Sequence, residues 1–540
     1  MYDPRHPNGY QPENVYEILR QHAVIRPDAE ALVEGSLRLS FRALKDRIDA
    51  LGKALMASGV GHGSHVFVVA PPGVMFFEVF LATASIGGVW CGGNPLYKTG
   101  EFAHLLDDID PVLVIVQSPF AGRDYAAELN AIDGTRQFVV FSGAGDTEWA
   151  HFVARGQAIS TGQHEQALAR VQGEDIAQLV YTSGTTGRPK GAMLSHRAIT
   201  WCALSSVAWM GDALTSTIMC APISHVGGLN FVCMNVFTYG GKVVFHERVD
   251  MPVLAQLTAQ ELPTYLVAGP TAFAMLFAMP GFDPSMFFGM YKLITFGGAP
   301  TPEEVLKVIG RSGARMATIY GQTETTSCAA CSPAGVSLEV MSSTIGRELD
   351  GVQIRIASAE GSELATGEVG EIQIKGPCVM SGYHRNEEAT RDAFTSDGFL
   401  KTGDLGQRRA DDFVVVVGRL KEMFKSGGYN VYPLEVESAI NQYPGILLSV
   451  VVAMPDDKYQ EVGHAFVVPA GAAVVSPAAL TAYLKDHVAN YKVPKQFSIV
   501  AELPMLSSGK VDRKLLRERV KASVLTAAST APTPPTGAAA

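Results

Sequence analysis

The sequence predicts an α/β protein with a large N-terminal domain and a small, mobile α+β C-terminal domain. At 540 residues the chain is too long for a single hydrophobic core, so two or more domains are expected. Short apolar runs alternate with helical patterns over most of the chain, which is typical of parallel sheets covered by helices on both faces. From Gly346 onward short strands with glycine turns take over, which indicates a smaller and largely antiparallel part.

The first part reads as two parallel αβ subdomains. Leu44, Ile48, Leu51 and Leu55 share one face of a helix expected over 40–58. Thr301 and Glu304 fit a capping box, with Pro302 at the first helical position. The other elements expected here are strands at 66–69, 112–116, 138–141, 242–245, 265–268 and 293–296, and a helix at 75–85.

The second part divides into a β-rich subdomain and a terminal α+β unit. The expected elements are strands at 352–356, 369–374, 414–417, 448–453 and 465–468, and helices at 434–442 and 477–488, the latter capped by Ser476. The last residues are almost entirely Ala, Pro, Thr and Gly, which predicts a disordered tail. We therefore expect an N-terminal domain at 1–417, a hinge at 418–421, a C-terminal domain at 422–523 and the tail at 524–540.

Composition excludes several classes of protein. A net charge of −10 argues against a nucleic-acid binder, which needs a basic face. No apolar stretch is long enough to cross a bilayer, and the polar N-terminus shows no secretory signal. Seven cysteines do not form a disulfide framework, and the pair Cys328 and Cys331 is expected to be reduced and packed. A cytoplasmic protein is the simplest interpretation.

The segment from Tyr181 to Gly191 is the strongest local signal for a ligand. It carries three glycines, four Ser or Thr hydroxyls and Lys190 between an apolar strand and a helix whose N-cap is Ser195. Glycine lets the backbone approach a ligand, and hydroxyl and amide groups can wrap a polyphosphate. The spacing is not that of a Walker A loop. The segment therefore predicts a nucleotide-phosphate loop, with a surface loop that binds nothing as the alternative.

Five further stretches follow this loop in a fixed order. They are 222–225 (Pro-Ile-Ser-His), 320–325 (Tyr-Gly-Gln-Thr-Glu-Thr), 401–404 (Lys-Thr-Gly-Asp), 418–429 from Gly418-Arg419-Leu420-Lys421 to Gly427-Gly428-Tyr429, and 504–510 ending in Lys510. Together with the loop they resemble the adenylate-forming superfamily of acyl-CoA synthetases, peptide-synthetase adenylation domains and beetle luciferases, most closely a fatty- or aryl-acid CoA ligase. The resemblance covers about Asn14 to Val520, nearly the whole chain.

The resemblance implies an AMP-forming acid–CoA ligase that uses ATP, Mg²⁺ and CoA. A carboxylate attacks the α-phosphorus of ATP, pyrophosphate leaves, and the acyl-adenylate is then passed to a thiolate. The first half requires charge neutralisation around an in-line phosphoryl transition state. The implied partners are therefore a small carboxylic acid, ATP and CoA, with no nucleic acid and no transmembrane segment. A homodimer is left open.

The resemblance also assigns roles to residues in the N-terminal domain. Glu324 would hold Mg²⁺, Tyr320 would stack on adenine, Thr325 would contact the α-phosphate, and Asp404 with Arg419 would bind the ribose. His225 would lie beside the substrate carboxylate. The residues implied to hold the β- and γ-phosphates are Thr182, Ser183, Gly184, Thr185, Thr186, Gly187 and Lys190, and those implied to line the nucleotide and acid pocket include Gly298, Ala299, Gly321 and Gln322.

In the C-terminal domain the resemblance makes Lys510 the adenylation catalyst and Lys421 the hinge. Lys425 would serve the thioester-forming conformation, and the pantetheine arm of CoA would pass Gly427, Gly428 and Tyr429. Each assignment has an ordinary alternative. The lysines read equally as solvated surface charges, Asp404 with Arg419 as a surface ion pair, Tyr320 as a core aromatic, His225 as a structural histidine and Glu324 as a solvated loop carboxylate.

Small residues around the expected acid pocket favour a medium- or long-chain fatty acid or a bulky aromatic acid. Gly227, Gly228, Gly297, Gly298 and Ala299 would leave volume, and an apolar pocket mainly measures size. Amino-acid-activating members of the superfamily carry an aspartate shortly after the residue equivalent to His225, and 226–231 contain no acidic residue, so the resemblance disfavours amino-acid substrates. A ligase that loads a separate carrier protein would share every motif. A luciferase-like oxygenase and a catalytically silent binding protein are the remaining alternatives.

Overall fold

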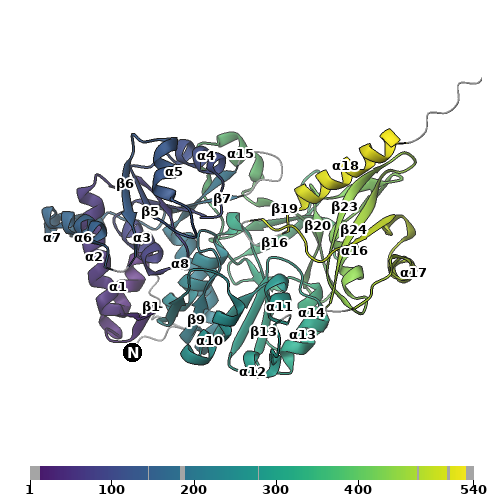
Figure 1. The fold of residues 1–540 in the computed structure, drawn as a ribbon, viewed down its shortest axis with the longest axis horizontal. Coiled ribbons are helices and arrows are strands. Elements are labelled where there is room, and N and C mark those ends of the chain that lie inside the picture. The colour runs from purple at the N-terminus through teal and green to yellow at the C-terminus, as the bar shows by residue number, and fades with distance from the viewer. Residues whose placement is uncertain are drawn as a thin grey trace, which may run out of the picture.

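The computed structural model describes residues 12–143, 145–182, 189–277, 279–470, 473–506 and 511–530. Within these ranges the strands form four sheets (Figure 1). Two large sheets build the N-terminal part, a four-stranded sheet follows, and a five-stranded sheet belongs to the C-terminal unit. No helix of the described ranges combines the length and the apolar character needed to span a bilayer.

The first large sheet carries the predicted phosphate loop. Its order is β18-β8-β7-β4-β3-β5-β6, and it is parallel except where β8 pairs with β7 and with β18. The strands are β3 (His65–Val69), β4 (Val89–Gly93), β5 (Leu113–Gln117), β6 (Gln137–Phe141), β7 (Ile176–Thr182), β8 (Lys190–Ser195) and β18 (Gly382–Tyr383).

The second large sheet has nine strands, and one of them, β13, leads into the 320–325 segment. Its order is β15-β14-β13-β12-β11-β9-β10-β1-β2, with a parallel centre from β13 to β1. The strands are β1 (Glu30–Glu34), β2 (Leu37–Ser40), β9 (Ser216–Met219), β10 (Lys242–Phe245), β11 (Tyr265–Ala268), β12 (Leu293–Gly297), β13 (Arg315–Tyr320), β14 (Ala330–Cys331) and β15 (Arg347–Glu348).

Helices between and around these sheets follow the predicted patterns. The helix α2 (Phe41–Ala57) buries Leu44, Ile48 and Leu55 completely and is capped by the Ser40 hydroxyl. Every residue of α3 (Val74–Ser85) is buried, because this helix contacts β1 of one sheet and β3, β4 and β7 of the other. Packing on two sides explains why α3 is mostly apolar all round its axis, with Glu78, Thr83 and Ser85 as its polar residues. The helix α8 (His196–Met210) begins after its N-cap Ser195, as predicted.

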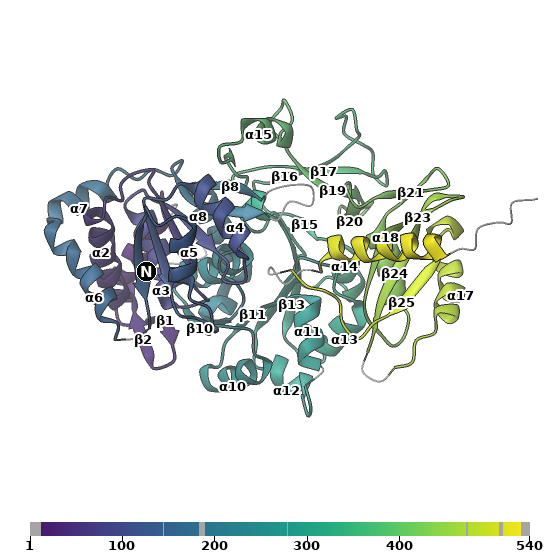
Figure 2. The same cartoon turned by 45° about the horizontal axis from the view of Figure 1, so that its top comes forward.

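The second half of the chain forms two antiparallel or mixed units. The four-stranded sheet contains β16 (Gln353–Ala357), β17 (Gly370–Lys375), β19 (Leu400–Arg408) and β20 (Val414–Arg419). The C-terminal unit contains β21 (Phe424–Ser426), β22 (Tyr429–Val431), β23 (Ile446–Asp456), β24 (Gln460–Pro469), β25 (Gln496–Ile499), α16 (Pro433–Asn441), α17 (Pro477–His487) and α18 (Arg513–Thr530). Figure 2 shows α18 lying along β23.

Two expectations about local structure are wrong. The loop after β7 returns as the strand β8 before α8 begins, so the segment is a hairpin rather than a strand–loop–helix unit. The helix α13 (Glu303–Gly310) is preceded by Pro302 at the cap, and buried Thr301 makes no capping bond, because the extended backbone of Pro302 delays the helix by one residue. The helix α18 continues to Thr530 and so includes 524–530, the first residues of the tail expected at 524–540.

The remaining helical and terminal residues do not alter this architecture. Ser476 occupies the N-cap position of α17, but its side chain makes no capping bond. All seven cysteines are free thiols, and Cys328 is buried. Residues 531–540 of the predicted tail lie outside the described residues.

Candidate active site

The 320–325 segment forms a tight turn at the end of β13. The backbone N–H of Gln322 donates to Thr325 Oγ1 at 2.9 Å, and the Thr325 hydroxyl donates to Gln322 O at 3.1 Å. A Cβ on Gly321 would lie 1.7 Å from the carbonyl oxygen of Ser327, so only glycine fits this position. Gly321 therefore has a packing role in the turn, whatever it contributes to a ligand.

Side chains from other elements hold the far end of this turn. Thr326 has a φ of 61°, a conformation that costs free energy for a residue other than glycine. Its hydroxyl donates to Cys378 O at 2.7 Å, and its carbonyl oxygen accepts from Asn230 Nδ2 at 3.1 Å. These contacts fix the backbone around Glu324 and Thr325. Sequence reasoning missed Asn230 and Thr326, since neither lies in a recognisable pattern.

Glu324 and Lys190 both contact Tyr383. The Tyr383 hydroxyl donates to Glu324 Oε1 at 2.8 Å, and Lys190 Nζ lies 4.8 Å from the centre of the Tyr383 ring. Burial and the neighbouring Glu324 raise the pKa of the Tyr383 hydroxyl, so it stays a donor at neutral pH. The structure thus brings together two predicted residues through a third that the sequence did not indicate.

This arrangement fits a Mg²⁺ site that is completed by a nucleotide. Mg²⁺ is commonly held by one or two carboxylates together with substrate phosphates and water. Within the described ranges no group of three or more His, Cys, Asp or Glu side chains is arranged for a metal. Glu324 Oε1 accepts from Tyr383, and no described residue donates to Oε2. A single carboxylate beside a lysine is what a metal carried by a polyphosphate requires.

Asp404 and Arg419 are neighbours on two adjacent strands of the four-stranded sheet. They are paired in register on β19 and β20, and Arg419 Nε lies 3.0 Å from Asp404 Oδ1. The other oxygen, Oδ2, accepts from the Tyr320 hydroxyl at 2.7 Å. Asp404 is 4% exposed and belongs to a strand, so the expected polar turn is wrong; the carboxylate is buried, whereas the Arg419 side chain is half exposed. Strand pairing with β20 buries the carboxylate.

The electrostatics of this cluster follow from burial next to a carboxylate. Asp404 raises the pKa of the Arg419 guanidinium, and burial with Asp404 raises the pKa of the Tyr320 hydroxyl. Each carboxylate oxygen has two lone pairs, so one acceptor position on each oxygen of Asp404 remains for a ligand hydroxyl. The cluster can therefore accept a diol such as a ribose while Tyr320 and Arg419 hold the carboxylate in place.

Only part of the small-residue set around His225 leaves open space. A Cβ on Gly228 would lie 2.7 Å from Pro222 O, and one on Gly297 would lie 2.6 Å from Ile319 Cγ1. The space beside these two glycines is already occupied by protein atoms, which corrects the expectation that they leave volume. Gly227 and Gly298 meet nothing within 4 Å, and Gly298 has a φ of 79° that favours glycine. Ala299 is exposed after β12, and His225 precedes the π-helical segment Gly227–Cys233.

The predicted catalytic loops are described only at their ends. Ser183, Gly184, Thr185, Thr186, Gly187 and Lys510 lie outside the described residues. Thr182 and Lys190 pair across the base of the first loop, as the last residue of β7 and the first of β8. Met505 and Val511 form a bridge at the base of the second loop. Each loop is therefore closed by strand pairing at its base.

The predicted CoA residues form a hairpin tip on the C-terminal sheet. Gly427 and Gly428 have φ values of 59° and 89° between β21 and β22, which a two-residue turn of type I′ requires. Tyr429 stacks on Tyr491 with ring centres 4.7 Å apart, and Lys425 is exposed on β21. Lys421 lies in a turn in which Arg419 O accepts from the N–H groups of Glu422 and Met423. The hairpin tip belongs to the five-stranded sheet, whereas Glu324 follows β13 of the nine-stranded sheet.

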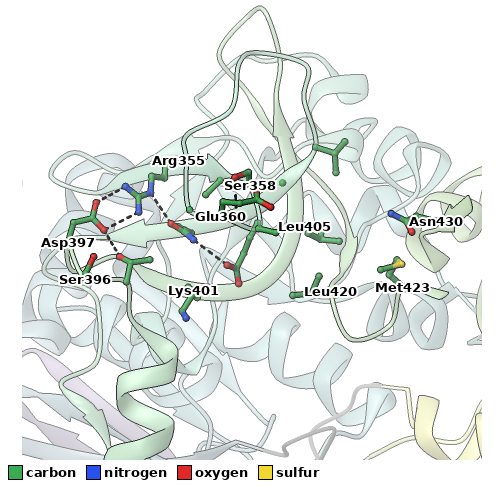
Figure 3. A pocket seen from close by; sticks show the side chains of 18 of the residues that line it. Arg355, Ser358, Glu360, Ser396, Asp397, Lys401, Leu405, Leu420, Met423 and Asn430 are labelled. Atoms are coloured by element: carbon green, nitrogen blue, oxygen red, sulfur yellow. Dashed lines mark hydrogen bonds and ion pairs between the residues drawn. The ribbon is translucent and has the colours of Figure 1, made fainter. Parts of the chain in front are cut away.

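A cavity of about 750 Å³ separates the four-stranded sheet from the start of the C-terminal unit (Figure 3). Arg355 donates to Asp397 at 2.7 Å and to Gln373 at 2.8 Å on its wall. Leu420 and Met423, on either side of Lys421, line the same cavity. None of the residues predicted to bind nucleotide or acid lines it. We therefore regard it as the space between the two units at the predicted hinge.

Comparisons with known proteins agree with this geometry. The family model described as "AMP-binding enzyme" matches residues 19–384, and the model described as "AMP-binding enzyme C-terminal domain" matches residues 435–510. The chain belongs to the AMP-binding enzyme family, which is the adenylate-forming superfamily that the sequence motifs indicated. It is accordingly an AMP-forming acid–thiol ligase that uses ATP, Mg²⁺ and CoA.

Individual relatives are similar over nearly their full length. A feruloyl-CoA synthase from Amycolatopsis sp is 30% identical over 501 residues, covering 92% of this chain and 97% of that protein. An indoleacetate–CoA ligase from Aromatoleum aromaticum is 31% identical over 509 residues, covering 93% and 98%. The crystal structure of ATP-bound MatB from Rhodopseudomonas palustris superposes with a TM-score of 0.83 at 29% identity, covering 94% of this chain and 99% of MatB.

Proposed function

We propose that this ligase activates a bulky aromatic or medium- to long-chain carboxylic acid as an acyl-adenylate and then transfers the acyl group to CoA. One observation carries the proposal. Lys190, Asp404 and Arg419 come from separate stretches of sequence and are linked to the 320–325 turn. Asp404 bonds to Tyr320 of this turn and pairs with Arg419, and Lys190 reaches Glu324 of the turn through Tyr383. Lys190 supplies a cation, Glu324 a carboxylate for a metal, and Asp404 a carboxylate held by two donors. These are the kinds of group that a nucleoside triphosphate requires, which supports the proposal.

In the first half-reaction an oxygen of the substrate carboxylate attacks the α-phosphorus, and the bond to the bridging oxygen of pyrophosphate breaks. Lys190 would neutralise charge on the leaving phosphates, and Thr325 would contact the α-phosphate. Glu324 would hold Mg²⁺, which supplies further positive charge when bound. Lys510, assigned by resemblance, would act on the α-phosphate from the C-terminal unit.

The adenosine would be held by the second cluster. Asp404 would accept from the two ribose hydroxyls while Arg419 and Tyr320 keep its carboxylate oriented. Tyr320 would pack against the adenine. In the second half-reaction the CoA thiolate attacks the acyl carbon and AMP leaves. Rotation at Lys421 would bring Lys425, Gly427, Gly428 and Tyr429 to the acceptor side.

The choice of acid rests on two supports of different kinds. The relatives named above are a feruloyl-CoA synthase and an indoleacetate–CoA ligase, both enzymes of aromatic acids. Gly227, two residues after His225, and Gly298 each have open space beside them, and His225 is the residue proposed to face the substrate carboxylate. We therefore place aromatic acids first and fatty acids second. A cytoplasmic location and a homodimer remain predictions, which cell fractionation and sedimentation would test.

The deciding experiment measures AMP release with ATP and CoA across aromatic, fatty and short-chain acids. An aromatic acid should give the highest kcat/KM, and a carrier protein in place of CoA should give little product. No AMP with any acid would overturn the proposal and favour a silent binding protein. Efficient transfer to a carrier protein alone would favour the carrier-loading alternative, and oxygen uptake with acyl-adenylate would favour an oxygenase.

The same assay separates the half-reactions through Lys510. Lys510→Ala should abolish ATP–pyrophosphate exchange and largely spare thioester formation from supplied acyl-adenylate. Lys514 is exposed on α18, so Lys514→Ala is the matched control and should leave both rates unchanged. Equal loss of both half-reactions in Lys510→Ala would count against the catalytic assignment.

A further inference from the structure

Tyr383 lies between the two opposite charges of the proposed phosphate site. Its hydroxyl donates to Glu324 Oε1 at 2.8 Å, while Lys190 Nζ lies 4.8 Å from its ring centre. We propose that Tyr383 is a positioning residue that keeps the Lys190 ammonium and the Glu324 carboxylate apart, so that one stays available to phosphate and the other to the metal. This inference rests on the proposed function, because it assumes those two roles.

Backbone pairing fixes Tyr383 at this place. The two-residue strand β18 adds to the edge of β8, with Tyr383 opposite Ala192 and Gly382 opposite Met193. The N–H of His384 donates to Gly191 O at 2.8 Å, directly beside Lys190. The N–H of Met380 donates to the carbonyl oxygen of Glu324 at 2.9 Å. One short segment therefore holds both the strand that carries Lys190 and the turn that carries Glu324.

Separation matters because a direct ion pair would neutralise both groups. Opposite charges attract strongly in a partly buried site, where the effective dielectric constant is low. Nevertheless, no described carboxylate lies within ion-pair distance of Lys190, and no described cation pairs directly with Glu324. The face of the Tyr383 ring offers the ammonium an alternative partner. Its hydroxyl occupies one oxygen of Glu324 and leaves the other for a cation.

The two functions of the side chain can be separated by substitution. Tyr383→Phe keeps the ring beside Lys190 and removes the hydrogen bond to Glu324. Tyr383→Leu removes both and allows Lys190 to pair with Glu324. The matched control is Tyr16→Phe, because the Tyr16 hydroxyl also donates to a carboxylate, Asp49 Oδ1 at 2.5 Å, in a partly buried pair between α1 (Val15–Ile25) and α2. Tyr16 touches none of the proposed site residues.

Binding is measured without turnover. The probes are Mn²⁺, followed by electron paramagnetic resonance in the presence of α,β-methylene-ATP, and metal-free α,β-methylene-ATP, followed by calorimetry. Tyr383→Phe should weaken Mn²⁺ binding about tenfold, as expected for a lost hydrogen bond to a charged group, and leave metal-free nucleotide binding within about twofold. Tyr383→Leu should weaken both about tenfold. Tyr16→Phe should change neither.

A double variant tests the separation of charges directly. In Tyr383→Leu with Glu324→Gln, Lys190 has lost the carboxylate that would capture it, so metal-free nucleotide binding should recover towards the wild-type value. No recovery would overturn the spacer role. Mn²⁺ binding of Tyr383→Phe within about twofold of wild type would overturn the positioning role.

Failure of this inference differs from failure of the proposed function. If Glu324→Gln weakens Mn²⁺ binding and Tyr383→Phe does not, the inference is wrong and the metal role of Glu324 stands. If Glu324→Gln leaves Mn²⁺ binding unchanged, both are wrong. If the Mn²⁺ results are as expected but the wild-type protein releases no AMP with any acid, only the proposed reaction is contradicted.

Discussion

The Tyr320 hydroxyl donates to Asp404 Oδ2 at 2.7 Å, across 84 positions of sequence. The bond ties the end of β13 in the nine-stranded sheet to β19 in the four-stranded sheet. The same carboxylate pairs at 3.0 Å with Arg419, which lies within the predicted hinge at 418–421. The proposed ribose acceptor is thus oriented by one residue from each side, and Tyr320 links it to the turn that carries Glu324.

Replacing Asp404 should therefore weaken ATP binding more than it slows chemistry. Asp404→Asn keeps the volume but removes the charge and one acceptor, and a hydrogen bond to a charged group contributes about 1.5–3 kcal/mol. The KM for ATP in pyrophosphate exchange should rise roughly tenfold to a hundredfold. Tyr320→Phe should give a smaller rise. Asp397→Asn is the control, since Asp397 pairs with Arg355 away from the site. An unchanged KM in Asp404→Asn would contradict the ribose assignment.

The turn at Gly427 and Gly428 allows a second prediction about the acceptor half. A Cβ on Gly428 would meet nothing within 4 Å, so Gly428→Ala is disfavoured only by its φ of 89°, at a cost of about 1–2 kcal/mol. The strained tip should shift, slowing thioester formation about fivefold or more while sparing pyrophosphate exchange. Gly361→Ala is a matched control, because Gly361 has a φ of 90° and open surroundings in another turn. Equal thioester rates in the two variants would remove the CoA role of this tip.

The strands that the sequence predicted have local signals. The strands β10 and β11 have exactly the expected bounds, since each is an apolar run flanked by polar or turn residues. The strand β8 was missed because it begins with Lys190 and Gly191 and was counted as loop. Its pairing with β7 depends on the turn between them rather than on apolar alternation.

The site was predictable as motifs but not as contacts. Glu324, Lys190 and Asp404 lie in recognisable stretches, whereas Tyr383 reaches Glu324 only because β18 adds to β8 from far along the chain. Pairing of a two-residue strand leaves no periodic signal in the sequence. Asn230 reaches Thr326 O through the same kind of long-range contact. Side chains that orient a catalytic group through tertiary contacts therefore require the structure.

A third prediction concerns the base of the loop that carries Lys510. Arg513 begins α18, three residues after Lys510, and its guanidinium donates to both oxygens of Glu437 at 2.7 Å. Glu437 is 3% exposed and also accepts from the N–H of Val451 at 2.7 Å. Removing one partner of a buried pair costs about 3–5 kcal/mol because a charge is left unpaired. Arg513→Met should therefore destabilise the C-terminal unit and lower the adenylation rate.

Hydrogen exchange of the β23 amides measures the loss of stability within the C-terminal unit itself. A single unfolding free energy for the whole multidomain chain would not report on this unit alone. The double variant Arg513→Met with Glu437→Gln should recover most of the lost protection, since it removes the unpaired charge and keeps an acceptor for the N–H of Val451. Arg519→Met, an exposed substitution on the same helix, is the control. If the β23 protection of Arg513→Met alone stays within about 1 kcal/mol of wild type, the Arg513–Glu437 pair does not anchor the C-terminal unit.

The last prediction is that acid weakens the N-terminal domain through His196. This histidine is 0% exposed at the start of α8, and its Nδ1 accepts from the N–H of Val15 at 3.3 Å. Burial lowers its pKa from 6.5 to about 4. The unfolded chain therefore binds a proton at His196 below about pH 6.5, whereas the folded chain binds it only below about pH 4. The contribution of neutral His196 to the free energy of unfolding is complete above pH 6.5 and is lost as the pH falls. Between about pH 7.5 and pH 5 the loss should be about 2 kcal/mol.

Tryptophan fluorescence during urea unfolding measures this loss, because all four tryptophans (Trp90, Trp149, Trp201 and Trp209) precede the predicted hinge. His196→Asn keeps an acceptor at the position of Nδ1 but cannot be protonated, so its unfolding free energy should fall about 2 kcal/mol less than that of wild type over this range. Burial also lowers the pKa of His22 to about 4, so the variant retains part of the dependence. His151→Asn, an exposed change on α6 (Thr147–Ala154), should behave as wild type. Identical pH dependence in His196→Asn and wild type would show that His196 is not the acid-sensitive group.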